Sequence, residues 1–115
     1  MITLYGITNC DTVRKARAWL ANQGVDYRFH DFRKQGVPEA ELHAWIEAVG
    51  WEPLVNRRGT TWRTLDAATR SGVTDAASAS ALMHAHPSVI KRPVVDWGTQ
   101  VTVGFDAGAW AARVP

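Results

Sequence analysis

Hydrophobic and polar positions change their period along the chain, and the changes mark the predicted elements. Residues 2–5, ITLY, form a short β-prone run that closes at Gly6. Between residues 11 and 23 the apolar side chains recur at helical spacing, namely at Val13, Ala16 and Leu20, and Gly24 ends the helix. Residues 25–31, VDYRFHD, alternate apolar and polar side chains as a half-buried strand does. The pattern therefore predicts a βαβ unit with parallel strands.

The middle of the chain predicts only helices and the loops between them. Proline, glycine and capping residues set the boundaries of these elements. In chain order we expect a loop at 31–38, a helix from Pro38 to Gly50, a short turn and loop at 51–61, a short helix at 62–70, and a helix at 75–85 that Thr74 caps and that ends before Pro87.

The end of the chain returns to β structure. Residues 93–97, PVVDW, and 100–105, QVTVGF, flank a turn at Gly98-Thr99 and predict an antiparallel hairpin, after which Asp106 caps a final helix. Without the helical block, the order βαβ followed by ββα is that of the thioredoxin fold. We therefore expect an α/β protein with a mixed four-stranded sheet, a single domain over residues 1–115, and an all-helical insertion at about 38–86.

Composition narrows the class of protein. The chain has 46% hydrophobic and 21% charged residues, which is typical of a globular domain. The 13 Lys and Arg against 11 Asp and Glu do not make the dense basic stripe of a nucleic-acid binder. No apolar run approaches the roughly 20 residues that cross a bilayer, and the first residues do not resemble a signal peptide. We expect a cytoplasmic monomer that binds neither nucleic acid nor membrane.

Two groups of residues leave alternatives open. Four basic pairs lie far apart in the sequence, and each alone is typical of solvated surface, whereas two or more together would bind an anion. The pairs are Arg14-Lys15, Arg33-Lys34, Arg57-Arg58 and Lys91-Arg92. Six tryptophans favour a buried core, although they could also form a stacking platform.

The single cysteine, Cys10, lies where the first strand passes into the first helix. Unpaired N–H groups and the helix dipole stabilise a thiolate there, which favours a reactive cysteine over a buried structural one. Because it is alone, it forms no internal disulfide. Two polar neighbours, Asn9 and Thr12, could hold the loop or donate to the sulfur. Arg14 and Lys15 supply positive charge one turn further on, whereas the carboxylate of Asp11 opposes it.

A second feature is Lys91-Arg92-Pro93, where a proline opens a strand after a long connection. The Arg92–Pro93 bond is either cis, which in a thioredoxin-like fold would deliver Arg92 to the cysteine pocket, or the bond of an ordinary edge proline. His84 and His86 are two apart and would face different sides of a helix, so we expect no metal site.

Four blocks in order carry a resemblance to a known family: TNCDTVRKARAWL, LVNRRGTTWR, TDAASASALM and HPSVIKRPVV. Together they resemble the arsenate reductase and Spx superfamily, most closely its YffB-like branch. The resemblance implies a thioredoxin-like domain with a helical insertion and Cys10 as the nucleophile. It also implies that Arg92 binds an oxyanion and that Pro93 is cis. Of two candidates for another anion-binding arginine, Arg58 is preferred to Arg57 because it lies four residues before an aromatic side chain, as in Spx.

The chain departs from the family pattern in two places. The last hairpin has no arginine, with Val103 near the equivalent position, so one contact to an oxyanion is missing. Val13 occupies the second position of the Cys-x-x-Cys pair through which Spx regulators sense oxidation. An internal disulfide switch is therefore excluded.

These features lead to three hypotheses. The first is a glutathione-dependent thiol-disulfide reductase with no bound cofactor, in which glutathione or glutaredoxin restores Cys10 and the substrate is a disulfide, including one in a protein. Glutathione carboxylates would suit Arg58 and Arg92, with Arg57 and Lys91 as further binding residues. The others are arsenate reduction and a non-catalytic adaptor that binds RNA polymerase as Spx does.

Overall fold

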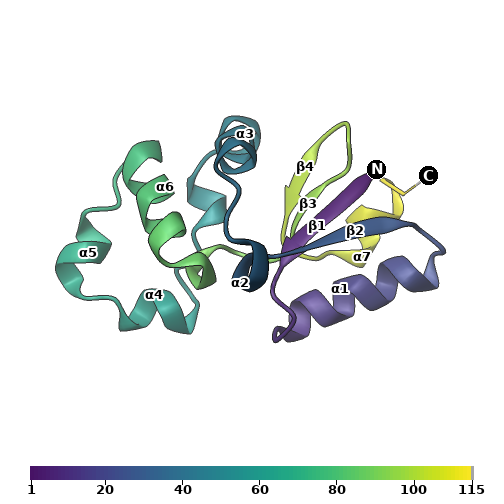
Figure 1. Ribbon diagram of the computed structural model, residues 1–115, viewed down its shortest axis with the longest axis horizontal. Helices are drawn as coiled ribbons and strands as arrows, with labels where there is room; N and C mark the ends of the chain where they lie inside the picture. Colours follow the sequence, from purple (N-terminus) through teal and green to yellow (C-terminus); the bar gives the residue numbers. More distant parts are fainter. Residues whose placement is uncertain (115) are drawn as a thin grey trace. The chain divides into compact units, whose positions relative to one another are not determined.

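The computed structural model describes residues 1–114 (Figure 1). Pro115, the last residue of the predicted domain, lies outside the described residues. The chain forms two compact units, one made of residues 1–35 together with the segment from 92 onward, and one made of residues 36–91. The predicted limits of the insertion, about 38–86, fall inside the second unit. The single-domain organisation of residues 1–115 stays a prediction.

The first unit is built on a mixed four-stranded sheet. Its strands are β1 (Ile2–Gly6), β2 (Tyr27–Asp31), β3 (Val94–Asp96) and β4 (Val101–Val103), in the order β2-β1-β3-β4. β1 pairs parallel with β2, whereas β3 pairs antiparallel with both β1 and β4. The helices are α1 (Asp11–Asn22), α2 (Phe32–Gln35) and α7 (Ala107–Ala111). The predicted thioredoxin-like order of βαβ and ββα is confirmed.

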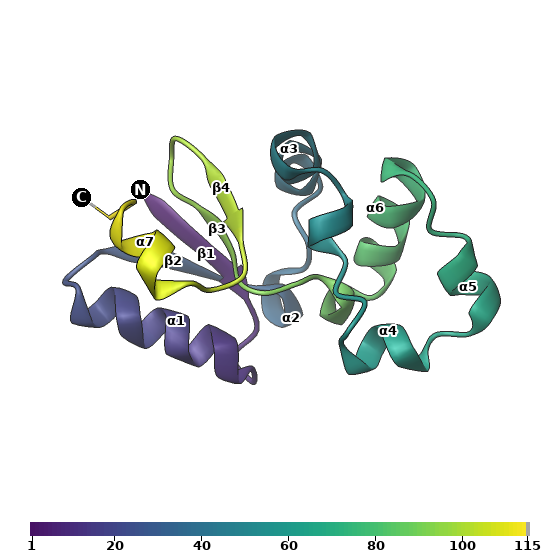
Figure 2. The ribbon, with the colours of Figure 1, turned by 180° about the vertical axis from the view of Figure 1, so that it is seen from behind.

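One face of this sheet packs against α1 and α7 (Figure 2). The apolar face of α1 supplies side chains that are fully buried against β1, namely Val13, Ala16 and Leu20. Trp110 of α7 completes this core, with its ring edge-on to Trp97 at 5.0 Å and to Phe105 at 4.8 Å between centroids. Asp106 caps α7 as predicted, accepting a hydrogen bond from the Ala109 N–H at 3.1 Å. This core fixes α1 on the sheet.

The second unit is helical, as predicted. Its elements are α3 (Glu39–Val49), η1 (Glu52–Leu54), α4 (Thr60–Thr64), α5 (Ala67–Ser71), α6 (Ala76–Ala85) and η2 (Pro87–Val89). Its largest fully buried side chains include Trp45, Leu42, Leu54, Met83 and Ile90. A single bridge between Val55 and Ile90 joins the two segments that follow η1 and η2.

Three local predictions were wrong. Residues 32–35 form one turn of helix rather than loop, because the buried Asp31 carboxylate accepts a hydrogen bond from the Arg33 N–H at 2.8 Å. The predicted helix at 62–70 divides into α4 and α5, because Asp66 caps the second through the Thr69 N–H. α6 is capped by Asp75 in a reciprocal capping box, not by Thr74.

Three of the six tryptophans are buried and three are half-buried. Trp45, Trp97 and Trp110 are buried, which confirms the core prediction for these three. Trp19, Trp51 and Trp62 are half-buried. No described helix is both long and apolar enough to cross a membrane.

Candidate active site

Cys10 is the residue that immediately precedes α1 and occupies its N-cap position, with extended backbone angles of φ −148° and ψ 122°. Its carbonyl oxygen accepts the first hydrogen bond of the helix from the Arg14 N–H at 2.9 Å. The side chain is half-buried and packs against the core of the first unit. The predicted place of the cysteine, at the strand-to-helix junction, is confirmed.

The groups around the sulfur hold the pKa of the Cys10 thiol below its ordinary value. Burial by itself raises this pKa, because it disfavours the charged thiolate. The backbone N–H of Val13, the Arg92 guanidinium and the backbone N–H of Thr12 all donate toward the sulfur, and their combined effect outweighs burial. A larger fraction of the thiol is therefore ionised at neutral pH, and the thiolate is the nucleophilic form.

Arg92 reaches Cys10 because of the sheet topology. β3 runs antiparallel beside β1, and Val94 lies opposite Tyr5, so the residues that precede β3 lie near the end of β1. The Arg92–Pro93 peptide bond is cis, which is the first of the two alternatives that the sequence left open for this bond. The Pro93 carbonyl accepts a hydrogen bond from the Gly104 N–H at 2.8 Å, which ties this segment to the end of the hairpin.

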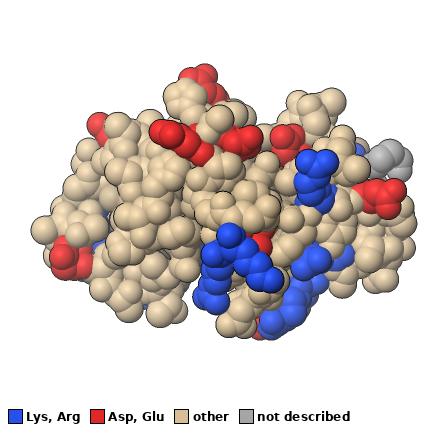
Figure 3. Space-filling model, viewed as in Figure 1, with Lys and Arg blue, Asp and Glu red and all other residues tan. Residues whose placement is uncertain are grey.

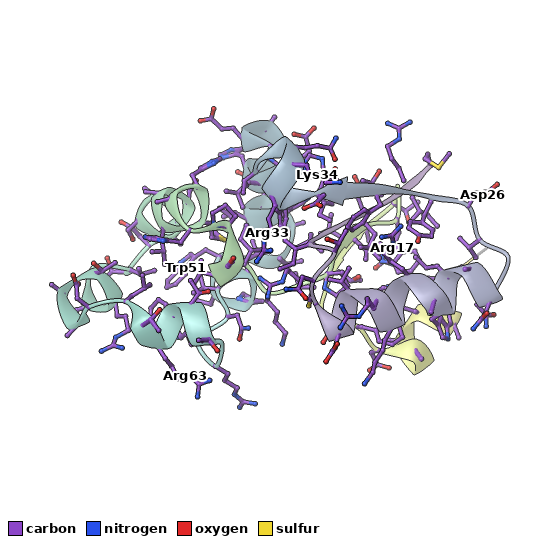
Figure 4. All side chains as sticks on the ribbon, turned by 60° about the horizontal axis from the view of Figure 1, so that its bottom comes forward. Arg17, Asp26, Arg33, Lys34, Trp51 and Arg63 are labelled. Atoms are coloured by element: carbon purple, nitrogen blue, oxygen red, sulfur yellow. The ribbon has the colours of Figure 1, made fainter. Side chains whose placement is uncertain are left out.

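The cation that acts on the sulfur is Arg92 rather than the cations of α1. Arg14 forms an ion pair with Asp11, so the positive and the negative side chain that were expected to influence Cys10 compensate each other. Lys15 is exposed and does not contribute to the shift in the thiol pKa. Figure 3 shows basic side chains over α1 at the surface, in the lower right of the view. Figure 4 shows a further one, Arg17, between α1 and β2.

The polar neighbours of Cys10 contribute unequally. Thr12 acts through its backbone N–H, whereas the sequence could only suggest its hydroxyl. Asn9 is exposed, and its contact with the sulfur stays a prediction. The Val13 N–H was missed at the sequence level, although the third amide after a helix N-cap is a regular donor to the capping side chain.

The remaining predicted site residues belong to the second unit. The guanidinium carbon of Arg57 lies 5.6 Å from the ring centroid of Trp51 and 5.9 Å from that of Trp62. Arg58 has an exposed side chain, and its backbone N–H donates to the Asn56 side-chain oxygen at 3.2 Å. Lys91 is also exposed, and its N–H donates to the Leu54 carbonyl at 2.8 Å. Their participation in one site with Cys10 stays a prediction.

The last hairpin carries no cation. Val103 of β4, near the position where the family pattern has an arginine, lies opposite Val94, and residues 94–105 contain neither Lys nor Arg. Among residues 1–114, no three His, Cys, Asp or Glu side chains gather where they could hold a metal ion. The chemistry that the described site offers is therefore that of a thiolate beside one arginine.

Comparison with known proteins agrees with the resemblance in the sequence. A family model described as the ArsC family matches residues 5–113. An uncharacterized protein of Haemophilus influenzae is 38% identical over 112 residues, which cover 97% of this chain and 97% of that protein. The global transcriptional regulator Spx of Streptococcus pyogenes serotype M6 is 28% identical over 112 residues, covering 92% of this chain and 79% of Spx.

Solved structures give the same picture. A structure named as the YffB protein superposes with a TM-score of 0.94 at 44% sequence identity, and the match covers 100% of both chains. The solution structure of an arsenate reductase (ArsC) related protein from Brucella melitensis has a TM-score of 0.76 and 48% identity, covering 96% of this chain and 92% of that one.

Proposed function

This chain belongs to the ArsC family, and we propose that it is a glutathione-dependent thiol-disulfide reductase in which Cys10 is the nucleophile. Membership of this family supports thiol-based redox chemistry in general. The proposal of glutathione-dependent disulfide reduction rests chiefly on one observation, the lowered pKa of the Cys10 thiol beside Arg92 and the first amides of α1.

The absence of a second cysteine from the sequence determines how the reaction must be completed. The Cys10 thiolate attacks one sulfur of a glutathione mixed disulfide, forms a new disulfide with the glutathionyl sulfur and expels the substrate as a thiolate, which takes a proton from water. A second glutathione thiolate then attacks that glutathionyl sulfur and releases Cys10 as thiolate. The mixed disulfide is thereby reduced to the substrate thiol, one glutathione thiol is consumed, and both glutathionyl groups leave together as glutathione disulfide.

The described residues of the first unit divide the work around this sulfur. Arg92 and the amides of Thr12 and Val13 stabilise negative charge on Cys10 before attack and again on its release. The backbone that precedes Pro93 would pair with an extended glutathione. Arg58 would add a contact to a glutathione carboxylate, a role that rests on the family resemblance. Asn9 would be a polar group in the loop before Cys10.

Arsenate reduction is a second candidate, because several structural neighbours are named arsenate reductases or related proteins. The hairpin without Lys or Arg argues against it, since a charge-assisted contact to an oxyanion contributes about 1.5–3 kcal/mol. We therefore expect disulfide reduction to be faster than arsenate reduction when glutathione or glutaredoxin supplies electrons to the same protein preparation.

The test is the pH dependence of Cys10 alkylation by iodoacetamide, followed by intact mass after treatment with oxidised glutathione. We expect a thiol pKa below about 8.5 and one glutathione adduct that excess reduced glutathione removes. Arg92→Ala should raise the thiol pKa. Lys15→Ala is the matched control, because it also removes a cation of α1 but one that is exposed and does not contribute to the shift, and it should leave the thiol pKa unchanged.

Activity is then measured with the mixed disulfide of glutathione and 2-mercaptoethanol, and Cys10→Ser should be inactive. An ordinary thiol pKa with no adduct would contradict the reductase proposal. Turnover retained by Cys10→Ser would show that Cys10 is not the nucleophile and would also contradict the proposal. Faster turnover of arsenate than of the disulfide would favour the second candidate.

A further inference from the structure

Two indole rings lie near the guanidinium of Arg57 within the second unit. Trp51 immediately precedes η1 and Trp62 belongs to α4, and the Arg57 guanidinium carbon lies within 6 Å of both ring centroids, at 5.6 Å and 5.9 Å. Both rings are half-buried and Arg57 is exposed. Figure 4 shows Trp51 on one side of α4 and Arg63 projecting from the other side of that helix. Arg57 therefore makes a cation–π contact with each of the two rings.

The backbone under this cluster is anchored. The Asn56 N–H donates to the Val89 carbonyl at 2.8 Å, and the Asn56 side chain accepts from the Arg58 N–H at 3.2 Å. Gly59 lies so close to Asn56 that a Cβ would approach its side-chain nitrogen to 2.8 Å. The backbone turn that carries Arg57 is thus fixed by contacts on both sides of it.

Among the described residues, the Arg57 guanidinium makes its two ring contacts but no side-chain hydrogen bond, so its N–H groups stay available. A guanidinium has five N–H groups in its plane, arranged as a fork that matches a carboxylate, and stacking on aromatic rings does not use them. Within residues 1–114 no carboxylate forms an ion pair with Arg57. Arg58 differs from Arg57, because in the same part of the chain no aromatic ring contacts the Arg58 guanidinium.

We propose that Trp51, Arg57 and Trp62 form a binding site for a carboxylate carried by a peptide. The two half-buried rings offer apolar surface to the aliphatic atoms next to a peptide carboxylate. Inorganic phosphate has no such aliphatic atoms. Tryptophan and arginine are also the residues that most often dominate the binding energy of protein interfaces. The site acts by binding and does not require Cys10, so it stands or falls separately from the reductase proposal.

The experiment is a titration of ¹⁵N-labelled protein with S-methylglutathione, a peptide with two carboxylates and no thiol that could react with Cys10. The readout is the indole N–H signals of Trp51 and Trp62, assigned with the Trp51→Phe and Trp62→Phe variants. Both signals should shift saturably. The diethyl ester of the same peptide, which lacks free carboxylates, should shift neither signal.

The variants compare the two adjacent arginines. Arg57→Ala should weaken binding at least tenfold and Arg57→Lys nearly as much, because an ammonium keeps the charge but loses the planar fork. Arg58→Ala, the matched control, should change the affinity less than twofold. Far-UV circular dichroism of each variant checks that the fold is kept.

Three results would overturn the inference: binding that survives Arg57→Ala but is lost in Arg58→Ala, equal binding of the diethyl ester, or equal shifts caused by inorganic phosphate. The titration is repeated in Cys10→Ser, where the same affinity is expected. If Cys10 shows no disulfide chemistry but the peptide still binds, the reductase proposal is refuted and this site stands. If Cys10 reacts as proposed but the peptide does not bind, this site is refuted and the reductase proposal stands.

Discussion

Gly6, the last residue of β1, approaches Val13 of α1 closely, and Gly6→Ala tests that contact. A Cβ at this position would lie 2.8 Å from Cγ2 and 3.3 Å from Cγ1 of Val13. Non-bonded carbon atoms pack at about 3.5–4.0 Å, so one partner must retreat by roughly 0.7 Å. Val13 is 0% exposed and has no open space to turn into. We therefore expect the start of α1 to move away from the sheet.

The expected cost follows from two opposing effects. Overpacking a core costs about 1–3 kcal/mol. A Gly-to-Ala change at an ordinary φ returns about 0.4–1 kcal/mol by restricting the unfolded chain, and the φ of Gly6 is not positive. Gly6→Ala should therefore lower the free energy of unfolding by about 1–2 kcal/mol net of these effects.

Val13→Ala supplies the decisive comparison, because it removes both atoms that the new Cβ would meet. Alone it should cost about 1.6 kcal/mol, from two buried methyl groups at about 0.8 kcal/mol each. In that background Gly6→Ala should no longer be destabilising. Gly108→Ala is the control, because its Cβ would lie 3.4 Å from the Asp106 Oδ1 and should stabilise α7 by about 0.5–1 kcal/mol.

The assay is urea unfolding of the four proteins of the double-mutant cycle and of the control, followed by circular dichroism. Alkylation of Cys10 adds a second readout, because Cys10 moves with α1 whereas Arg92, which precedes β3, stays with the sheet, so Gly6→Ala should also raise the thiol pKa. If Gly6→Ala costs the same with and without the Val13 side chain, to within about 0.5 kcal/mol, the contact does not carry the effect and the reasoning is refuted.

Three further changes test the fold and the site. Because the pKa of Cys10 is lower in the folded state, its thiolate stabilises the fold above the unfolded pKa of about 8.5, and this contribution is lost as the pH falls through the folded pKa. In urea titrations with reductant, the stability of the wild type relative to Cys10→Ser should therefore rise with pH; a flat difference would contradict the lowered pKa. Trp110→Ala should cost about 3–5 kcal/mol in the same assay, since this ring is 1% exposed, and a cost under about 1 kcal/mol would show that α7 does not need it. Asp106→Ala should cost about 0.5–2 kcal/mol and Asp106→Asn much less, and equal losses would mean that charge rather than capping is at work.

Periodicity was sufficient where an element has both a buried face and a clear end. The helix that carries Val13, Ala16 and Leu20, and the glycine turn of the last hairpin, follow directly from the order of apolar and polar residues. Periodicity failed where one acidic side chain decides the matter. Asp66 starts a new helix inside a segment that reads as continuous, because a local hydrogen bond to a backbone amide can outweigh the pattern of apolar residues over two turns.

The site shows the same division. The helix N-cap position of Cys10 could be predicted, because the change of period from strand to helix occurs beside it. Which cation faces the sulfur could not be derived from spacing, since Arg92 comes from the far end of the chain and Arg14 is occupied by Asp11. The rings around Arg57 were also missed, because a turn rather than a periodic element brings Trp51 and Trp62 to it.

The placement of Cys10 at the start of α1 also determines how long an adduct lasts. A thiolate that backbone amides and Arg92 stabilise is a good leaving group, because the charge that returns to the sulfur when a disulfide breaks is accommodated at once. The helix thus shifts the thiol-disulfide equilibrium toward the reduced protein. In the proposed reaction, Cys10 would therefore leave a mixed disulfide quickly and would be present mostly as the reduced thiolate.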